Sequence, residues 1–247
     1  MLAAVLGEGK TIIKNAAMEP EIIDLQIFLN RMGAKITGAG TNTILINGVK
    51  SLKDVSYNIM PDRIEAGTLL CAVAITGGKI KLNKLETEHI TPILIKLEEC
   101  GCKISLSKNS VYLEAPKRLK AVDIKTMPYP GFPTDMQSVF ASILCIAKGT
   151  SIITENIFEN RYKYLNELKR MGANIKIEGK NAIIKGTRKL YGANVESTDL
   201  RGGAAMVVAA LNAKGTTKVS NIEHILRGYE NLDIKLNKLG AKIKLEK

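Results

Sequence analysis

The sequence predicts a mixed α/β (α+β) fold in which repeated helix-and-sheet copies surround central apolar helices, and three observations support this class. A glycine joins the end of an amphipathic helix to a strand four times, at Gly33, Gly101, Gly172 and Gly240, which are 68, 71 and 68 residues apart. Another glycine ends an apolar helix and begins a strand 23 to 25 residues before each of these. Three segments, 69–75, 139–147 and 204–211, are apolar nearly all round a helix and are expected in the core. The regular spacing indicates four copies that pack on each other, because one copy alone leaves apolar faces uncovered.

The first copy, residues 1–60, lacks the helix start that the other copies have. "MLAAVLGEG" (1–9) is expected to be the last part of an apolar helix, without a cap or a first turn. We therefore expect that Met1 is not the natural start of the fold and that upstream sequence is missing. A strand, a second helix and a hairpin follow, and "GAGTNT" (38–43) is the expected hairpin turn. The apolar surface of 22–32 normally packs within its own domain, so self-association through this copy is expected.

The other three copies begin with recognisable helix starts, at Pro61, Pro133 and Ser197. Each continues as helix, strand, second helix and strand, followed by a hairpin strand where the chain continues. The glycine after each second helix suits the left-handed position beyond a helix end, which most residues avoid. By the same pattern, a strand is expected in 241–247 at the end of the fourth copy.

Composition limits the class of protein. A chain of 247 residues buries a sizeable core, and 45% hydrophobic with 24% charged residues is typical of a soluble globular protein. The longest apolar runs, 67–78 and 202–213, are too short to cross a bilayer. The chain begins without a basic region and soon reaches Glu8, so no signal peptide is expected and the cytoplasm is the expected location.

The net charge of +12 is compatible with a basic, non-catalytic repeat protein that binds nucleic acid. Steeply salt-dependent binding to DNA or RNA would be the signature of such a protein. Aromatic residues make up only 4% of the chain, however, and single-strand binders place aromatic side chains beside their positive charge. A cleft for a small anionic substrate explains the charge at least as well. No nucleic-acid or membrane partner is expected.

The four cysteines are expected to be buried structural thiols. Cys100 and Cys102 form "CGC", a spacing too tight for an ordinary zinc pair, and only His89 and His224 could complete a site. Cys71 and Cys145 lie in apolar helices. No metal and no cofactor is expected.

Three aspartates, Asp62, Asp135 and Asp199, lie at equivalent positions at the starts of the central helices. A capping role explains such an acid ordinarily, because it accepts backbone N–H bonds and complements the positive end of the helix. Two features favour a binding site as well: Arg63 and Arg201 follow two of the acids, and polar residues recur at the starts of the second helices. Those polar residues are Glu19, Glu86, Glu88, Asn160, Arg161, His224 and Arg227.

If the copies pack side by side, all these helix starts lie at one end of the assembly. Positive helix ends and arginines together suit phosphate and carboxylate groups. One of the acids could then act as a base. The prolines of "PYPGFPTD" (128–135) would hold Asp135 with little backbone freedom.

Six motifs together resemble the bacterial UDP-N-acetylglucosamine 1-carboxyvinyltransferases, a family of enolpyruvyl transferases. They are "NAAMEPEIIDL" (15–25), "MPDRIEAGT" (60–68), "PYPGFPTDMQ" (128–137), "ENIFENRY" (155–162), "STDLRGGAA" (197–205) and "HILRGYENLDIKL" (224–236). The resemblance implies an inside-out α/β barrel with two similar domains, each made of three such copies. Four of the six copies are present: residues 1–60 would be the last copy of one domain and 61–247 the three copies of the other, with a hinge near 58–64.

The resemblance also implies a reaction and a set of site residues. Enolpyruvyl passes from phosphoenolpyruvate to the sugar 3-hydroxyl of UDP-N-acetylglucosamine, and phosphate leaves after addition and elimination, as the first committed step of peptidoglycan synthesis. Asp135 matches the catalytic carboxylate that is the proposed base. The matched substrate-binding residues are the nucleotide-sugar contacts Ile157 and Phe158, the cleft residues Arg161, Asp199, Arg201 and Arg227, and, with less defined roles, Glu19, Asp62, Arg63 and Lys235.

The chain also departs from the family pattern. The family's lysine–asparagine pair, its loop cysteine and several phosphate-binding arginines belong to an N-terminal half that this sequence does not contain, and none of the four cysteines lies in a matching loop. We therefore expect the purified chain by itself to release little or no phosphate from phosphoenolpyruvate in the presence of UDP-N-acetylglucosamine. Efficient turnover in a phosphate-release assay would contradict this expectation.

Two other interpretations of the function remain open. One is the sister enzyme that adds enolpyruvyl to shikimate 3-phosphate, although "FPTDMQ" and "HILRGYEN" suit the nucleotide-sugar enzyme better. Binding of a uridine nucleotide would separate these two. The other is a degenerate relative kept for a regulatory or partner-binding role.

Overall fold

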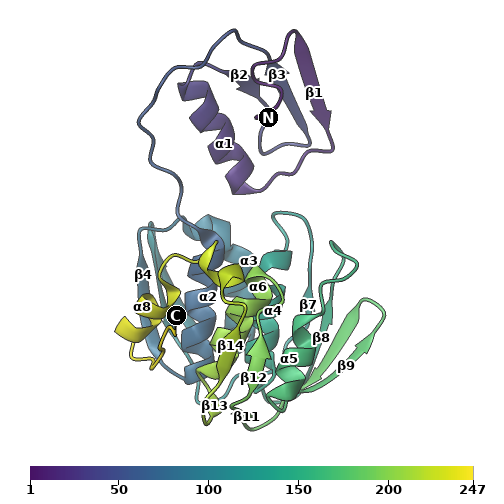
Figure 1. The fold of residues 1–247 in the computed structure, drawn as a ribbon, viewed down its shortest axis with the longest axis vertical. Helices are drawn as coiled ribbons and strands as arrows, with labels where there is room; N and C mark the ends of the chain where they lie inside the picture. The colour runs from purple at the N-terminus through teal and green to yellow at the C-terminus, as the bar shows by residue number, and fades with distance from the viewer. Residues whose placement is uncertain (247) are drawn as a thin grey trace. The chain divides into compact units, whose positions relative to one another are not determined.

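The computed structural model describes residues 1–246, and the chain forms two compact units. The first unit comprises Met1–Pro61 with Pro128–Gly131, and the second comprises 62–127 with residues from Phe132 onward. Figure 1 labels most of the helices and strands. No described helix combines the length and apolar character needed to cross a membrane.

The first unit is a three-stranded antiparallel sheet and one helix, formed by β1 (Lys10–Lys14), α1 (Pro20–Arg31), β2 (Lys35–Thr37) and β3 (Thr43–Asn47). The strand order is β1-β3-β2, and the central strand β3 buries Ile44 and Ile46. The predicted turn in 38–43 is confirmed, since Gly38 and Gly40 have positive φ angles between β2 and β3. The predicted helix end in 1–9 is wrong: these residues form turns. Gly7 and Gly9 disfavour a helix here, because glycine loses more backbone freedom in a helix than other residues do.

The second copy of the repeat opens the second unit. It consists of α2 (Arg63–Thr76), β4 (Lys79–Asn83), the 3-10 helix η1 (Thr87–Ile90), α3 (Thr91–Glu99), β5 (Lys103–Ser107) and β6 (Ser110–Glu114). The sheet order is β4-β6-β5, with β6 paired antiparallel to both neighbours. Alternate residues of β6, Val111 and Leu113, are fully buried beneath the sheet. This copy therefore repeats the topology of the first unit with an apolar helix added in front.

The third copy consists of β7 (Ile124–Lys125), α4 (Thr134–Leu144), β8 (Thr150–Thr154), α5 (Tyr164–Arg170), β9 (Asn174–Glu178) and β10 (Asn181–Lys185). Its sheet has the order β7-β8-β10-β9. The connecting strand β7 was not predicted and pairs parallel to β8. That pairing places the end of β7 beside the end of β8, where the candidate site begins.

The fourth copy departs from the pattern. It contains β11 (Leu190–Tyr191), β12 (Asn194–Glu196), α6 (Leu200–Ala210), β13 (Ala213–Lys214), β14 (Lys218–Ser220), α7 (Glu223–Leu226) and α8 (Leu232–Lys238). The strands form two parallel pairs, β11 with β13 and β12 with β14. The strand predicted in 241–247 is not found over 241–246, and Lys247 lies outside the described residues. In the other copies the equivalent strands β2, β5 and β9 pair with a following strand, and no described residue after Gly240 supplies one.

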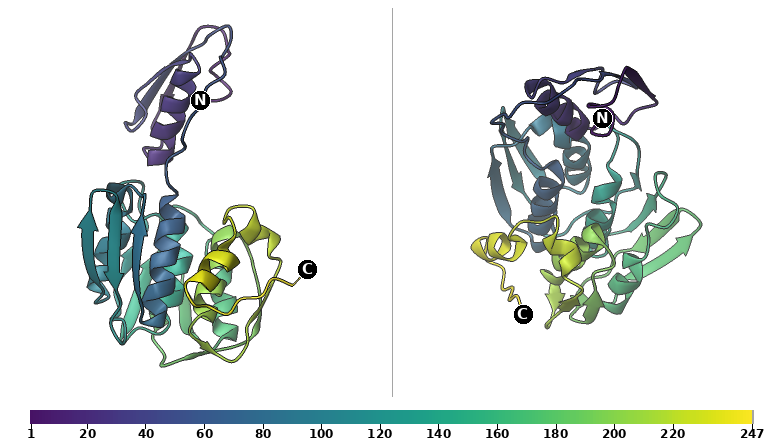
Figure 2. Two further views of the ribbon diagram at one scale, coloured as in Figure 1. Left: turned by 90° about the vertical axis from the view of Figure 1, so that its left-hand side faces the viewer. Right: turned by 45° about the horizontal axis from the view of Figure 1, so that its top comes forward.

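The central helices α2, α4 and α6 pack against one another with the sheets outside them, as Figures 1 and 2 show. Their buried positions run almost unbroken, as the apolar sequences predict. The four glycines that follow the second helices, Gly33, Gly101, Gly172 and Gly240, all have φ near +90 to +100°, which confirms their predicted left-handed conformation. All four cysteines are buried, also as predicted, and burial raises the pKa of Cys100 to about 12.

Candidate functional site

The first turns of α4 and α6 meet at Asp135, which binds two arginines at once. One carboxylate oxygen accepts a hydrogen bond from Arg161 Nη2 at 2.9 Å. The other accepts from Arg201 Nε at 3.1 Å and from Arg201 Nη2 at 2.9 Å. Arg161 comes from the loop between β8 and α5, and Arg201 is the second residue of α6. We call Asp135, Arg161 and Arg201 the Asp135 cluster.

The three aspartates are not equivalent, contrary to the prediction. Asp62 caps α2, accepting from the backbone N–H groups of Ile64 and Glu65 at 2.7 and 3.0 Å. Asp199 caps α6 in the same way, with both bonds at 2.9 Å. Pro133 occupies the cap position of α4, so Asp135 lies inside the first turn and caps nothing. Its carboxylate is 38% exposed and is directed to the arginines instead.

Tyr229 packs against the Arg201 guanidinium and connects the Asp135 cluster to α2. The Arg201 guanidinium carbon lies 5.4 Å from the centroid of the Tyr229 ring, within the range of a cation–π contact. The Tyr229 hydroxyl lies 3.0 Å from the Thr68 hydroxyl, which itself donates to the Ile64 carbonyl at 2.8 Å. Either hydroxyl can donate in this pair. Neither Tyr229 nor Thr68 is predicted from the sequence, although Tyr229 lies in the "HILRGYEN" motif and Thr68 ends the "MPDRIEAGT" motif.

The charges of the cluster stabilise one another. Burial raises the pKa of the Asp135 carboxyl, but Arg201 and then Arg161 outweigh burial, and the pKa lies below its ordinary value. Burial lowers the pKa of Arg201, but Tyr229 and Asp135 outweigh burial and raise it overall. Asp135 is thus ionised at neutral pH between two cations, and the cluster carries one net positive charge. Such a group attracts anions, and a carboxylate so paired is a weak base until its arginines move away.

An exposed apolar pair lies on the loop that carries Arg161. Phe158 is 51% exposed and Ile157 is 39% exposed. The Arg161 guanidinium carbon lies 4.8 Å from the centroid of the Phe158 ring. The structure therefore brings together four predicted residues from three motifs, Asp135, Phe158, Arg161 and Arg201. A ring, an apolar side chain and two cations side by side suit a planar, negatively charged ligand.

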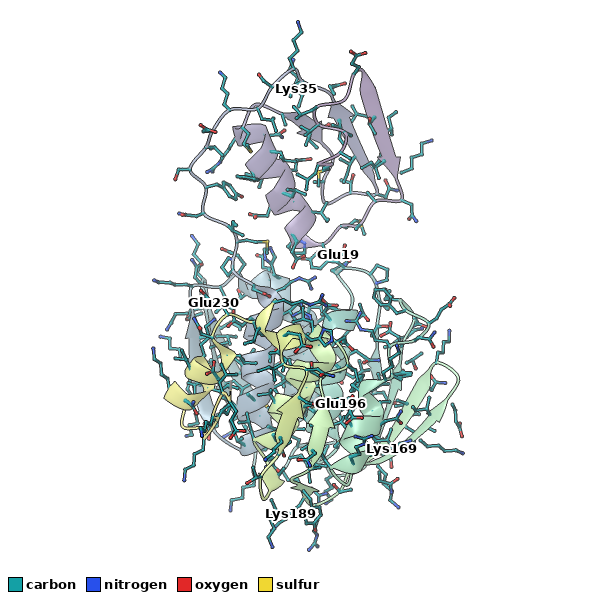
Figure 3. All side chains as sticks on the ribbon, viewed as in Figure 1. Glu19, Lys35, Lys169, Lys189, Glu196 and Glu230 are labelled. Carbon is teal, nitrogen blue, oxygen red and sulfur yellow. The ribbon has the colours of Figure 1, made fainter. Side chains whose placement is uncertain are left out.

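The other predicted residues lie apart from this cluster or in supporting positions. Lys235 of α8 pairs with Glu65 of α2 at 2.5 Å. Arg63 is the buried first residue of α2, and Arg227 is exposed just after α7. Glu19 precedes α1 in the first unit, where its side chain makes no capping hydrogen bond; Figure 3 labels it. Within residues 1–246, no group of three or more His, Cys, Asp or Glu side chains could hold a metal ion.

Comparisons with known proteins place the chain among the enolpyruvyl transferases. Residues 1–244 match the family model described as EPSP synthase (3-phosphoshikimate 1-carboxyvinyltransferase). The chain is 57% identical over 244 residues to UDP-N-acetylglucosamine 1-carboxyvinyltransferase 2 of Caldanaerobacter subterraneus subsp. tengcongensis, covering 98% of this chain and 58% of that protein. It is 53% identical to UDP-N-acetylglucosamine 1-carboxyvinyltransferase of Geobacter metallireducens, covering 99% of this chain and 58% of that protein.

Solved structures agree on the fold. The enolpyruvyl transferase NikO from Streptomyces tendae superposes with a TM-score of 0.85 at 27% identity, covering 97% of this chain and 57% of that one. EPSP synthase from Acinetobacter baumannii superposes with a TM-score of 0.76 at 19% identity, covering 100% of this chain and 60% of that one. These likenesses confirm the predicted fold class. The chain spans about 58% of the length of the curated relatives it matches.

Replacing Asp135 with asparagine tests the charge pairing through stability. Because the folded-state pKa of Asp135 lies below the unfolded value of about 3.9, its ionised form stabilises the folded chain above pH 4 to 5, and that contribution is lost as pH falls through the lowered pKa. Asp135→Asn should reduce the free energy of unfolding by about 1 kcal/mol at pH 7, a modest value because solvent screens the partly exposed carboxylate.

Urea denaturation of both proteins at pH 7 and at pH 3 measures this difference. The stability gap should narrow at the lower pH. A gap of the same size at both pH values would contradict the pairing.

Proposed function

The chain belongs to the EPSP synthase family of enolpyruvyl transferases, and we propose that its protein transfers enolpyruvyl from phosphoenolpyruvate to the 3-hydroxyl of UDP-N-acetylglucosamine and releases phosphate. This is the first committed step of peptidoglycan synthesis. The observation that carries the proposal is Asp135, which binds Arg161 and Arg201 beside the exposed ring of Phe158. We assign residues 1–60 to the last copy of one domain and 61–247 to the three copies of the other.

The proposed chemistry uses one proton acceptor and several anion-binding groups. The sugar 3-hydroxyl oxygen bonds to C2 of phosphoenolpyruvate while that hydroxyl loses its proton and C3 gains one. In the second step C3 loses a proton, the double bond to C2 re-forms and phosphate leaves. Asp135 is the proposed acceptor of the hydroxyl proton. Both substrates are anionic, so the arginines of the cluster are the groups suited to bind them.

Substrate binding would also activate the base. In the free chain, Arg201 and Arg161 hold the pKa of Asp135 below its ordinary value. A phosphate or carboxylate that takes over these arginines removes the ion pairs from Asp135, and its pKa rises toward the range of a useful proton acceptor. The anion therefore has to bind before the proton is transferred. This order keeps the carboxylate inactive until a substrate is present.

The remaining predicted residues take binding roles in this proposal. Ile157 and Phe158 contact the nucleotide end of the substrate, since they are exposed apolar side chains on the loop that carries Arg161. Asp199 sets the start of α6, and so the direction of Arg201, through its two capping bonds. Asp62 caps α2 in the same way, and Arg63 is the first residue of that helix. Arg227 binds substrate anions, as the family resemblance implies, and Glu19 and Lys235 keep the less defined binding roles that the resemblance gives them.

The sister reaction on shikimate 3-phosphate is the second candidate, because the matching family model carries that description. The names of the relatives at 53 and 57% identity favour the nucleotide sugar. The exposed Phe158–Ile157 pair favours it as well, because a nucleotide offers more apolar surface than a small phosphorylated ring acid.

Ligand titration followed by amide NMR signals separates the two candidates. We expect UDP-N-acetylglucosamine to shift the signals of Ile157, Phe158 and Arg161, and Phe158→Ala to weaken its affinity about tenfold, or about 1.4 kcal/mol. Ile177→Ala removes a similarly exposed apolar side chain from β9 and should leave the affinity unchanged.

A larger response to shikimate 3-phosphate would favour the sister reaction. No response to either ligand would contradict a nucleotide-sugar site formed by this chain. Binding is the chosen readout because the chain spans only part of the length of its relatives.

A further inference from the structure

Glu155 is a buried acid that no motif-based prediction assigns a role. It follows β8 directly and is 3% exposed. One carboxylate oxygen accepts from the Thr126 hydroxyl at 2.8 Å and from the backbone N–H groups of Ile157 at 2.7 Å and Phe158 at 3.2 Å. The other oxygen accepts from the Thr134 hydroxyl at 2.9 Å. Four hydrogen bonds thus satisfy a carboxyl group that would be costly to bury without partners.

The four donors come from three segments around the candidate site. Thr126 follows β7, Thr134 is the first residue of α4 and precedes Asp135, and the two N–H groups belong to the loop between β8 and α5. Asn156 adds two bonds to Thr126, from its backbone N–H to the hydroxyl at 2.9 Å and from Nδ2 to the carbonyl at 3.1 Å. The near end of the loop is therefore held to both β7 and α4.

The far end of the same loop is held to the same helix turn. Arg161 donates to Asp135, one residue after Thr134. The loop that presents Ile157 and Phe158 is thus fixed to the first turn of α4 at two points, through Glu155 and through Arg161. The Asp135 carboxylate and the exposed Ile157–Phe158 pair are therefore both held at the first turn of α4.

We propose that Glu155 is a positioning residue that sets the affinity for the nucleotide end of the substrate by fixing the Ile157–Phe158 loop relative to Asp135. This inference rests on the proposed function. A loop already ordered before binding loses less conformational entropy when the ligand arrives, so its ligand binds more tightly. Without Glu155 the two backbone N–H groups would have no acceptor and the loop would sample other conformations.

The hydrogen-bond chemistry predicts which substitutions preserve this role. In Glu155→Gln, the amide oxygen can take the place of the oxygen that accepts from Thr126, Ile157 and Phe158. The amide nitrogen can then donate to the Thr134 hydroxyl, which is able to accept. Glu155→Leu keeps a side chain of similar size and loses all four bonds. Glu159→Gln makes the same chemical change as Glu155→Gln at an exposed position of the same loop and is the matched control.

Amide hydrogen exchange in the chain without ligand tests the positioning. Exchange at Ile157 and Phe158 should become at least a hundredfold faster in Glu155→Leu, less than tenfold faster in Glu155→Gln and unchanged in Glu159→Gln. Amides of β10 report whether the second unit stays folded. If Glu155→Leu does not fold, Thr126→Val and Thr134→Val, which each remove one donor, should each speed exchange at Ile157 and Phe158 at least threefold. Unchanged exchange at both amides in a folded Glu155→Leu, or in both valine variants, would overturn the proposal.

Affinity for UDP-N-acetylglucosamine provides the second measurement. Glu155→Leu should weaken binding at least tenfold, and Glu155→Gln less than threefold. Equal affinity in Glu155→Leu and the unaltered chain would show that Glu155 does not set affinity. If the unaltered chain binds no UDP-N-acetylglucosamine, the proposed function fails, and with it the effect on affinity; the exchange rates then still decide whether Glu155 fixes the loop.

Discussion

The packing of α2, α4 and α6 against one another is the constraint on which the candidate site depends. Each helix is apolar on nearly every side, so each is stable only when its neighbours cover it. Contacts near the starts of these helices show that the starts lie together: Asp135 of α4 binds Arg201 of α6, and Tyr229 connects Arg201 to Thr68 in the second turn of α2. Three positive helix ends in one place repel one another and attract anions. Asp62 and Asp199 offset that charge at two of the starts by capping.

The start of α4 differs from the starts of α2 and α6. At α4, Pro133 takes the cap position and the carboxylate of Asp135 is left to bind side chains. A partly buried ion pair contributes little net stability, because desolvation cancels much of the attraction. The main contribution of the ion pairs is to orientation, because they hold the guanidinium groups of Arg161 and Arg201 at fixed positions around the Asp135 carboxylate. Glu155 extends the arrangement by fixing the neighbouring loop to the same helix turn.

Much of this could be predicted from the sequence because it depends on local patterns. The left-handed glycines, the apolar helices and the buried cysteines all follow from composition within a few residues. Asp135, Arg161 and Arg201 were predicted one by one, but their mutual bonds join residues 26 and 66 positions apart and depend on packing. Glu155 lies in the "ENIFENRY" motif but is assigned no role from the sequence, because a buried acid after a strand cannot be told from an exposed one by sequence alone. The strand expected in 241–247 is not found over 241–246, because a strand needs a partner strand that its own sequence cannot specify.

The most direct test is a carbon-13 NMR titration of the Asp135 carboxyl group, in the free chain and with UDP-N-acetylglucosamine and phosphoenolpyruvate added. We predict a pKa below about 3.9 in the free chain. We also predict a higher pKa when the ligands bind, because their anionic groups take over Arg161 and Arg201. An ordinary pKa in the free chain would contradict the paired cluster. A pKa that stays low while amide signals report bound ligands would contradict the role of Asp135 as the base.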